Sequence, residues 1–257
     1  MKYLNDVNYK DCVGKVCKSL NSGDFKIVKY NNAKDVEVQF LKTGYEATVH
    51  LVHVKRGNVK DPYSPSVRGV GVTGTKYPIT VDDVITKEYD LWHNMLQRCY
   101  NGAFKKKRPT YEGCEASENF KYYECFYEWC HKQIGFGNQG WQLDKDLLVK
   151  GNKVYSEDSC VFLPQEINSL LVKSNTSRGE YLIGVCWDKA KKVFKAQVRK
   201  NKGKSEHLGL FKTELEAFKA YKQAKESFIK EQAEKLEGQI DERAYKALMK
   251  YEVNIDD

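Results

Sequence analysis

Two aspartates on either side of a lysine mark the stretch of the sequence best suited to chemistry. Residues 140–164 read GWQLDKDLLVKGNKVYSEDSCVFLP, with Asp144, Lys145 and Asp146 inside an otherwise apolar strand pattern. Two neighbouring carboxylates could hold Mg²⁺ or Mn²⁺, which prefer oxygen ligands, and the lysine could hold an anionic substrate group. Alternatively, the carboxylates end a strand and accept hydrogen bonds from nearby backbone N–H groups. The sequence leaves both interpretations open.

The distribution of charge favours a polyanionic partner. The net charge of the chain is +8, but residues 1–80 carry +6, 81–177 carry −2, 178–235 carry +7 and 236–257 carry −3. Basic flanks could hold DNA or RNA through its phosphates, while the acidic middle keeps the carboxylates that a divalent metal needs. Surface lysines that serve only solubility explain this alternation less well.

The composition is that of a globular protein without a membrane segment. With 257 residues, 41% of them hydrophobic and 12% aromatic, the chain can form two or three compact domains. No apolar run reaches about 18 residues and no signal peptide is indicated, so the expected location is the cytoplasm. The eight cysteines include no CxxC pair. We expect them to be reduced and mostly buried, and structural zinc is not indicated.

The first part of the chain has the pattern of short antiparallel strands. Between residues 11 and 56, apolar and polar residues alternate in runs separated by the turn sequences NSGD, NNAKD and KTG. This predicts a small β-barrel or curled sheet over residues 1–60. Within it, His50 and His53 are expected to face opposite sides of a strand and to form no metal site. Residues 61–79, rich in proline and glycine, predict an extended connector.

Helical spacing replaces this alternation after residue 80. One helix is predicted over residues 81–100, with Val84, Tyr89, Trp92, Met95, Leu96 and Cys99 inward. A second is predicted over residues 118–133, with Phe120, Tyr123, Phe126, Tyr127 and Cys130 inward. A hairpin, a short strand and a further helix follow. We therefore place a central domain at residues 80–175.

The order of these blocks resembles that of phage-borne endonucleases related to the HNH superfamily. The resemblance covers roughly residues 80–172 and rests on the blocks WHNMLQRCYN, YEGCEASENFKYYECFYEW, LDKD and YSEDSCVFLPQEIN. It implies a ββα-metal unit, in which a histidine activates water while an acidic residue and a further Asn or His hold one Mg²⁺ or Mn²⁺. The Asp-His strand motif of the family falls on Asp144 and Lys145, and its later Asn falls on or near Ser159.

The chain departs from the HNH pattern at Lys145, the position of the general base, and at Ser159, the position of the second metal ligand. Lysine is no general base at neutral pH unless its pKa is strongly lowered, and serine is a poorer Mg²⁺ ligand than a carboxylate. In one explanation the site is rebuilt: Asp144 and Asp146 hold the metal, and Lys145 holds the scissile phosphate or the attacking water. His131 or His93 would then reach in from a helix as the base. In the other, the domain has lost its chemistry and keeps only DNA binding.

The region from residue 176 to residue 236 predicts three strands and a helix. Apolar residues alternate with polar ones from Phe194 to Arg199, so one face of a strand can pack while the other presents two cations and an amide. Thr213 and Glu216 have the spacing of a capping box at the start of the helix. Its apolar stripe consists of Leu215, Phe218, Tyr221, Ala224 and Phe228.

This region resembles the AP2 DNA-binding domain of ethylene-response factors from Gly179 to Ala224. The matching residues are Gly184, Val185, Trp187, Phe194, Ala196, Val198, Arg199, His207, Leu208, Gly209, Phe211, Glu214, Ala217, Ala220 and Tyr221. The resemblance implies that the exposed face of the sheet enters the major groove of double-stranded DNA. The candidates for reading bases are Arg199, Gln197, Lys195 and His207, since arginine can pair with guanine and glutamine with adenine.

Other residues of the AP2-like region are expected to contact the DNA backbone. Lys189, Lys192 and Lys204 are candidates for phosphate contacts, and Trp187 is expected to pack in the core with contact to a sugar. The first strand departs from the family, because a cysteine and an aspartate, Cys186 and Asp188, stand where plant members carry arginines.

Residues 237–257 predict a C-terminal helical tail. The helix of the AP2-like region continues past its usual end, breaks at Gly238 and gives way to a second helix at Asp241. The apolar side of this second helix consists of Ala244, Tyr245, Leu248 and Met249. It either folds back on the chain or contacts a second subunit.

The sequence therefore predicts an α+β protein with an N-terminal β module, an HNH-like centre and an AP2-like reader. The function expected is a site-selective, divalent-metal-dependent DNA endonuclease of the homing or mobile-element type, acting in the cytoplasm of a host cell. The alternative is a catalytically inactive DNA-binding regulator or anti-defence protein. An RNA-binding module is disfavoured, because the sheet lacks the exposed aromatic pair expected for base stacking.

Overall fold

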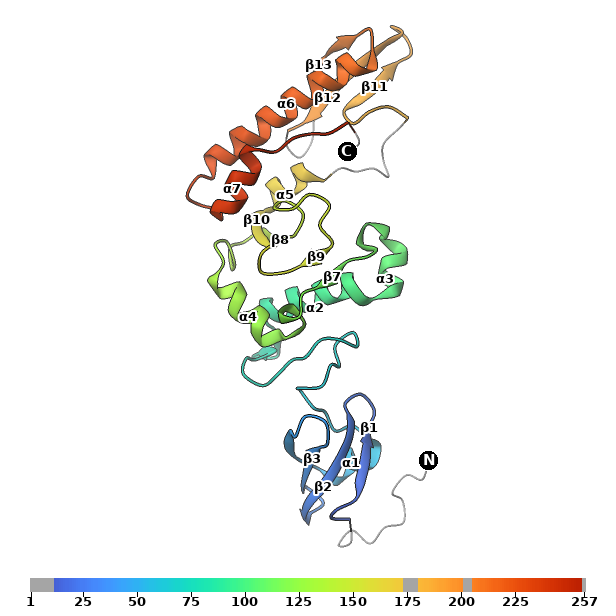
Figure 1. Ribbon diagram of the computed structural model, residues 1–257, viewed down its shortest axis with the longest axis vertical. Coiled ribbons are helices and arrows are strands. Elements are labelled where there is room, and N and C mark those ends of the chain that lie inside the picture. The colour runs from blue at the N-terminus through green and yellow to red at the C-terminus, as the bar shows by residue number, and fades with distance from the viewer. Residues whose placement is uncertain (1–11, 173–179, 201–204, 256–257) are drawn as a thin grey trace. The chain divides into compact units, whose positions relative to one another are not determined.

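The protein is a mixed α+β chain with several small antiparallel sheets (Figure 1). The computed structural model describes residues 12–172, 180–200 and 205–255. The chain forms two compact units, Met1–Trp129 and Cys130–Asp257.

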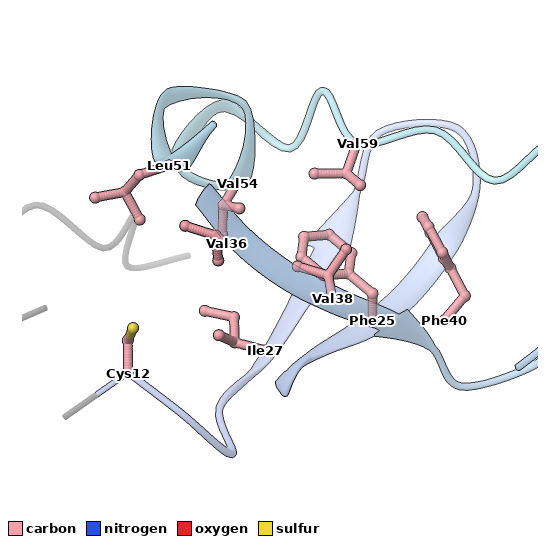
Figure 2. Close-up of a cluster of buried hydrophobic side chains, with 9 residues drawn as sticks. All are labelled: Cys12, Phe25, Ile27, Val36, Val38, Phe40, Leu51, Val54 and Val59. Carbon is pink, nitrogen blue, oxygen red and sulfur yellow. The ribbon is translucent and has the colours of Figure 1, made fainter. Parts of the chain in front are cut away.

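The first unit begins with a four-stranded antiparallel meander. The strands β1 (Val16–Ser19), β2 (Gly23–Asn32), β3 (Asp35–Phe40) and β4 (Glu46–Val49) pair in chain order. Alternate residues of β2 and β3 point into one apolar core, as the sequence pattern predicts. Figure 2 shows this core, which consists of Cys12, Phe25, Ile27, Val36, Val38, Phe40, Leu51, Val54 and Val59.

A short helix replaces the last part of the predicted meander. Helix α1 (Leu51–Arg56) begins directly after β4 and buries Leu51 and Val54. These two residues lie three positions apart, a spacing that places both on one face of a helix. The prediction that His50 and His53 face opposite sides of a strand was therefore wrong. They lie at the start of α1 with their ring centroids 6.0 Å apart.

The remainder of the first unit is organised around α2 (Lys87–Tyr100) and the first turns of α4 (Tyr123–Lys132). Trp92 of α2 is fully buried, and its indole N–H donates to the carbonyl of Phe120 over 2.8 Å. Tyr123 lies against the same indole, with ring centroids 5.5 Å apart. The elements between these helices are α3 (Gly102–Lys107), η2 (Pro109–Tyr111), β7 (Glu115–Ala116) and η3 (Asn119–Lys121).

The helix predicted over residues 81–100 begins only at Lys87. Before it, β5 (Thr80–Val81) and β6 (Val84–Ile85) form a small hairpin whose turn residues, Asp82 and Asp83, have φ values of 49° and 61°. Aspartate tolerates this left-handed conformation, and two such residues favour a hairpin turn. Val84 is 68% exposed, so its predicted place on the buried helix face was wrong.

The predicted connector is packed rather than extended. Residues 61–79 contain a short bridge between Val67 and Gly71, and a second bridge joins Val72 to Tyr122. A Cβ atom on Gly71 would lie 2.5 Å from Leu96 Cδ1, so this backbone approaches α2 too closely for any other residue.

The second unit opens with a strand–strand–helix arrangement. Strand β8 (Trp141–Asp144) pairs antiparallel with β10 (Val161–Pro164), and Asp144 lies opposite Val161. The connection between them contains β9 (Val154–Tyr155). Helix α5 (Gln165–Leu171) follows β10 and packs against both strands. The predicted order of hairpin and helix is therefore present.

A three-stranded antiparallel sheet follows, with β11 (Val185–Asp188), β12 (Val193–Arg199) and β13 (Ser205–Phe211) in chain order. The long helix α6 (Glu214–Lys235) packs against this sheet. Its predicted capping box is confirmed: Thr213 accepts from the N–H of Glu216, and the Glu216 carboxylate accepts from the N–H of Thr213. Leu215 is 48% exposed and does not belong to the buried stripe.

The C-terminal segment folds back on the second unit. Helix α7 (Glu242–Met249) is capped by Asp241, whose carboxylate accepts from the N–H of Arg243. One apolar core joins residues of β10, α5, α6 and α7, namely Val161, Leu163, Ile167, Ile229, Ala233, Ile240, Ala244 and Leu248. Of the two alternatives for the apolar side of this helix, the structure shows the fold-back. The segments predicted as separate at residues 80–175, 176–236 and 237–257 thus share a core.

All eight cysteines are free thiols, and five of them are buried. Among the described residues, no helix has both the length and the apolar character needed to cross a bilayer.

Candidate functional site

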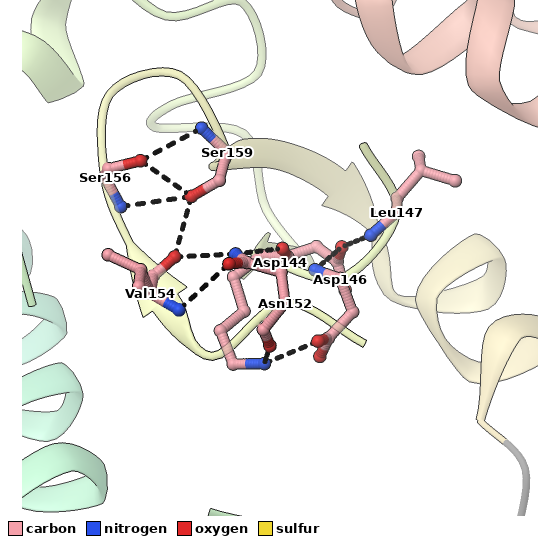
Figure 3. A network of polar contacts seen from close by, with 8 residues as sticks. Asp144, Asp146, Leu147, Asn152, Val154, Ser156 and Ser159 are labelled. Atoms are coloured by element: carbon pink, nitrogen blue, oxygen red, sulfur yellow. Dashed lines mark hydrogen bonds and ion pairs between the residues drawn. The ribbon is translucent and has the colours of Figure 1, made fainter. Parts of the chain in front are cut away.

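Asp144 ends β8 and organises the turn that follows it. Its Oδ1 atom accepts hydrogen bonds from the backbone N–H groups of Asp146, over 2.9 Å, and Leu147, over 2.8 Å (Figure 3). This is the capping arrangement that the non-chemical interpretation of the LDKD segment predicts. Burial raises the pKa of the Asp144 carboxyl above its ordinary value, and the two backbone donors oppose that shift.

Lys145 is buried. Its side chain is only 7% exposed, and its ammonium donates to Asp146 Oδ1 over 2.5 Å and to the carbonyl of Asn152 over 2.7 Å. The ammonium also lies 5.7 Å from the centroid of the Tyr155 ring. This arrangement favours a structural role for Lys145 over contact with a substrate phosphate.

Asn152 fixes the other side of the same loop. Its Nδ2 donates to the carbonyls of Lys145, over 2.9 Å, and Val154, over 2.6 Å, while its Oδ1 accepts from the N–H of Val154 over 3.0 Å. Sequence reasoning did not single out this residue. The sequence contains a signal for it, because an asparagine that follows a glycine is typical of a turn closed by the asparagine side chain.

Ser159, the position matched to the HNH asparagine, is used locally. Its hydroxyl donates to the carbonyl of Val154 over 2.7 Å and lies 2.8 Å from the hydroxyl of Ser156. The two serines thereby close the turn before β10 (Figure 3). The next residue, Cys160, is fully buried, and burial raises the pKa of its thiol to about 12, so it is no nucleophile at neutral pH.

The carboxylates of this loop fit a divalent cation incompletely. Asp144 has one oxygen engaged by two backbone donors, and Asp146 is paired with the ammonium of Lys145. Within the described ranges, no cluster of three or more His, Cys, Asp or Glu side chains has the arrangement of a metal site. A hard cation would therefore find two partly occupied carboxylates where Mg²⁺ usually takes several oxygen ligands.

The two histidines expected as possible bases lie against aromatic rings. His131, exposed on α4, meets Phe136 edge-to-face with ring centroids 5.0 Å apart. His93 belongs to the first compact unit and stacks on Tyr89 at 6.1 Å. Burial, with the charge of Arg68, lowers the pKa of His93 and favours its neutral form. These contacts assign neither residue to the Asp144 turn.

A polar contact that the sequence analysis missed joins α5 to β8. Asn168 Nδ2 donates to Gln142 Oε1 over 2.9 Å. Gln142 and Asp144 are two positions apart on β8, so they share one face of the strand. The polar face of the strand–strand–helix unit therefore includes residues from both the strand and the helix.

The second candidate site is the face of the β11–β13 sheet opposite α6, which we call the outer face. Strand register places Lys195 opposite Cys186 and Leu210, and Gln197 opposite His207. Residues directly opposite in antiparallel strands share a face. The four residues expected to read bases therefore lie on the outer face: Lys195, Gln197, Arg199 and His207.

A β-bulge brings His207 to this face. Ala196 pairs with Gly209, but the next residue, Gln197, pairs with His207, so β13 carries Leu208 as an extra residue. Without it His207 would lie opposite Val198, which is 1% exposed and packs under α6. Bulges commonly redirect a side chain in this way.

No family model, no curated protein and no solved structure matches this chain. Its function therefore has to be inferred from its residues and their geometry.

Four polar side chains of the outer face are not used by the fold itself. Within the part of the chain that the structure describes, the side chains of Lys195, Gln197, Arg199 and His207 form no hydrogen bond or ion pair. Their donors and acceptors remain available to a ligand. The other face differs, because Ala196 is fully buried there.

The turn between β11 and β12 carries two of the expected phosphate contacts. Lys189 and Lys192 are exposed in it, and Lys192 adopts a left-handed φ of 54°. Asp188 holds the turn, since its Oδ1 accepts from the N–H groups of Ala190 and Lys191, each over 3.0 Å. Asp188 thus has a local structural role.

The two remaining candidates differ in what the structure says of them. Trp187 is half-buried and packs edge-to-face on Phe194 with ring centroids 4.8 Å apart. Lys204 lies outside the described residues.

Proposed function

We propose that this chain binds double-stranded DNA through the outer face of β11–β13. The observation that carries the proposal is the strand register, which gathers four unpartnered polar side chains on one face of a sheet whose other face is buried under α6. A sheet supported in this way holds its side chains in fixed relative positions, as base recognition requires.

The side chains suit the edges of base pairs. The guanidinium of Arg199 can donate two hydrogen bonds to O6 and N7 of guanine, and the amide of Gln197 can pair with N6 and N7 of adenine. Lys195 and His207 add donors beside them. Exposed lysines of the β11–β12 turn would contact phosphate and position the sheet without reading sequence.

The test replaces Arg199 by alanine and measures affinity for a duplex selected by the wild-type chain and for duplexes altered at single positions. Loss of a bidentate contact should cost about 1–3 kcal/mol on the selected duplex and much less on one altered at the contacted base pair. Lys219→Ala is the matched control, because Lys219 is an exposed cation on α6. If Arg199→Ala weakened binding equally on every duplex, base reading by the outer face would be ruled out.

A second proposal is strand cleavage by a divalent-metal-dependent endonuclease of the homing or mobile-element type. It is supported by the order β8, β10, α5, which is the strand–strand–helix order that the HNH resemblance implies, with Asp144 at the end of the first strand. The incomplete fit of the carboxylates to Mg²⁺ or Mn²⁺ favours the competing proposal, a DNA-binding regulator or anti-defence protein that does not cut.

Supercoiled DNA incubated with the protein and Mg²⁺ or Mn²⁺ separates the two proposals. Asp144→Asn is the informative variant, because an asparagine Oδ1 can still accept the N–H groups of Asp146 and Leu147 while the charge is lost. Nicking by the wild type that disappears in Asp144→Asn supports cleavage. Tight binding without strand breaks in either metal leaves the non-cutting regulator.

A further inference from the structure

The helical part of the first unit carries a block of uncompensated positive charge. Residues 91–111 contain five lysines and arginines and no aspartate or glutamate. Four of the five are consecutive: Lys105, Lys106, Lys107 and Arg108, which we call the α3 basic segment. The acidic residues elsewhere in residues 81–177 hide this block when charge is summed over the whole region.

Local structure fixes the α3 basic segment at the end of a capped helix. Asn101 ends α2 and caps α3, its Oδ1 accepting from the N–H of Phe104 over 2.9 Å. The three lysines then occupy the last turn of α3, and the N–H of Arg108 donates to the carbonyl of Lys105 over 3.0 Å. Lys106, Lys107 and Arg108 are exposed and Lys105 is half-buried.

Two other lysines of the same unit have acidic partners, which the α3 basic segment lacks within the described ranges. Lys76 pairs with Glu128, and Lys121 pairs with Glu118. Among the described residues, the α3 basic segment forms no ion pair. Lysines that serve solubility are usually interspersed with acidic residues, whereas a run of one sign attracts a polyanion.

Two aromatic rings pre-organise the arginines of this surface. The guanidinium of Arg108 lies 5.5 Å from the centroid of the Phe104 ring, and that of Arg98 lies 5.7 Å from the centroid of the Tyr111 ring. The two rings lie 5.8 Å from each other. Since a guanidinium already lies by each ring, the rings offer less surface on which a base could stack. The surface therefore suits phosphates better than unpaired bases.

We propose that the α3 basic segment is a second DNA-binding surface, which grips the phosphate backbone of a duplex independently of its sequence. It rests on the proposed function, in which the outer face of β11–β13 reads bases in the second unit. Sequence-independent phosphate contacts supply affinity, speed association and allow a protein to slide along DNA while the reading surface searches. The two compact units would thereby divide grip and reading between them.

The test uses the full chain with all four residues of the segment replaced by glutamine. Affinity for a selected duplex and a scrambled duplex is measured over a range of salt concentrations. Each lost phosphate contact should lower the salt slope by about 0.9, so the loss of all four should lower it by about 3.6, and the variant should bind both duplexes roughly 100-fold more weakly at low salt. The ratio between the two duplexes should stay unchanged.

A control variant removes the same number of charges from residues 12–60 of the same unit. Lys26, Lys34, Lys42 and Lys60 are exposed and form no ion pair among the described residues, so their replacement by glutamine should change affinity less than about threefold. If the two variants lost equal duplex affinity, the loss would be due to the change in net charge alone, and the proposal would be overturned.

The outcomes separate this inference from the function on which it rests. If the wild type binds a duplex selectively and the glutamine variant behaves like the wild type, the α3 basic segment is no DNA surface while the outer face still reads. If the wild type binds no duplex, both proposals fail. A variant that loses affinity for single strands or anionic vesicles but not for duplexes would also overturn the assignment.

Discussion

The turn after β8 and the outer face of β11–β13 contain the same kinds of residues and use them in opposite ways. In the turn, the side chains of Asp144 and Asn152 form hydrogen bonds with backbone groups of the loop, and the Lys145 ammonium donates to the carbonyl of Asn152. On the outer face, Gln197 and Arg199 make no such bonds among the described residues. One region is completed by its own side chains and the other is not.

The comparison shows why residue type alone did not locate the site. A loop leaves backbone N–H and C=O groups without partners from secondary structure, and nearby Asp, Asn and Ser side chains satisfy them. Strand β12 has its backbone satisfied on both sides by β11 and β13, so its polar side chains have no such task. Charged residues on a central strand are therefore stronger evidence for a ligand than charged residues in a turn.

The largest expected difference between the two regions is in stability. Lys145→Met keeps the aliphatic volume but leaves the carbonyl of Asn152 without its charged donor, and we expect it to lower the free energy of unfolding by about 2 kcal/mol. Lys195→Met on the outer face should change it by less than about 0.5 kcal/mol. Urea denaturation of both variants checks this.

In DNA binding, the order of the two effects should be reversed, with the larger effect in Lys195→Met. Lys195→Met should weaken binding to a selected duplex, while Lys145→Met should bind as the wild type does wherever it is folded. If Lys145→Met kept full stability and lost DNA affinity instead, the interpretation of Lys145 as a structural residue would be wrong.

Much of the architecture could be predicted from local pattern, and the failures have identifiable causes. The alternation in β2 and β3, the capping box of α6 and the helix beginning at Asp241 are all local signals, and the structure contains them. The hairpin of β5 and β6 was missed because its apolar residues, Val84 among them, also fit a helical period. The shared core of α5, α6 and α7 was missed because it joins residues far apart in the sequence.

The candidate sites were predictable to different extents. The outer face follows from strict alternation along β12, which is visible in the sequence. The position of His207 also depends on a β-bulge, which the sequence pattern does not reveal. The role of Lys145 could not be predicted, because its partner Asn152 approaches only when the loop closes. The α3 basic segment was overlooked because charge was summed over a long region.

Lys225 is an intermediate case, a half-buried cation without a partner among the described residues. It lines a small cavity with Leu170, Tyr221 and Tyr251. Burial lowers the pKa of its ammonium to about 8. The folded pKa of Lys225 is below its pKa in the unfolded chain. Burial of this side chain therefore costs no stability above the unfolded pKa, where it is neutral in both states, and the protein loses stability as pH falls from there through about 8.

Lys225→Met should therefore stabilise the protein at pH 6, by about 1 kcal/mol after allowance for its partial exposure. The gain should shrink as pH rises from 8 towards 10, because the wild-type side chain is then neutral in the folded state. Thermal unfolding at several pH values measures it. A gain that is constant over this range would trace to packing and not to the charge.

The smallest expected effect concerns Asp188, which belongs to both kinds of region. Its carboxylate caps the β11–β12 turn, yet by strand alternation it lies on the outer face, where a negative charge opposes DNA. Asp188→Asn keeps an acceptor for the N–H groups of Ala190 and Lys191 and removes the charge, so it should raise duplex affinity about twofold at unchanged stability. Asp188→Ala should instead lose about 1 kcal/mol of stability, because the two donors lose their acceptor. An Asp188→Asn variant that bound duplex DNA more weakly than the wild type would mean that DNA does not approach the outer face at this turn.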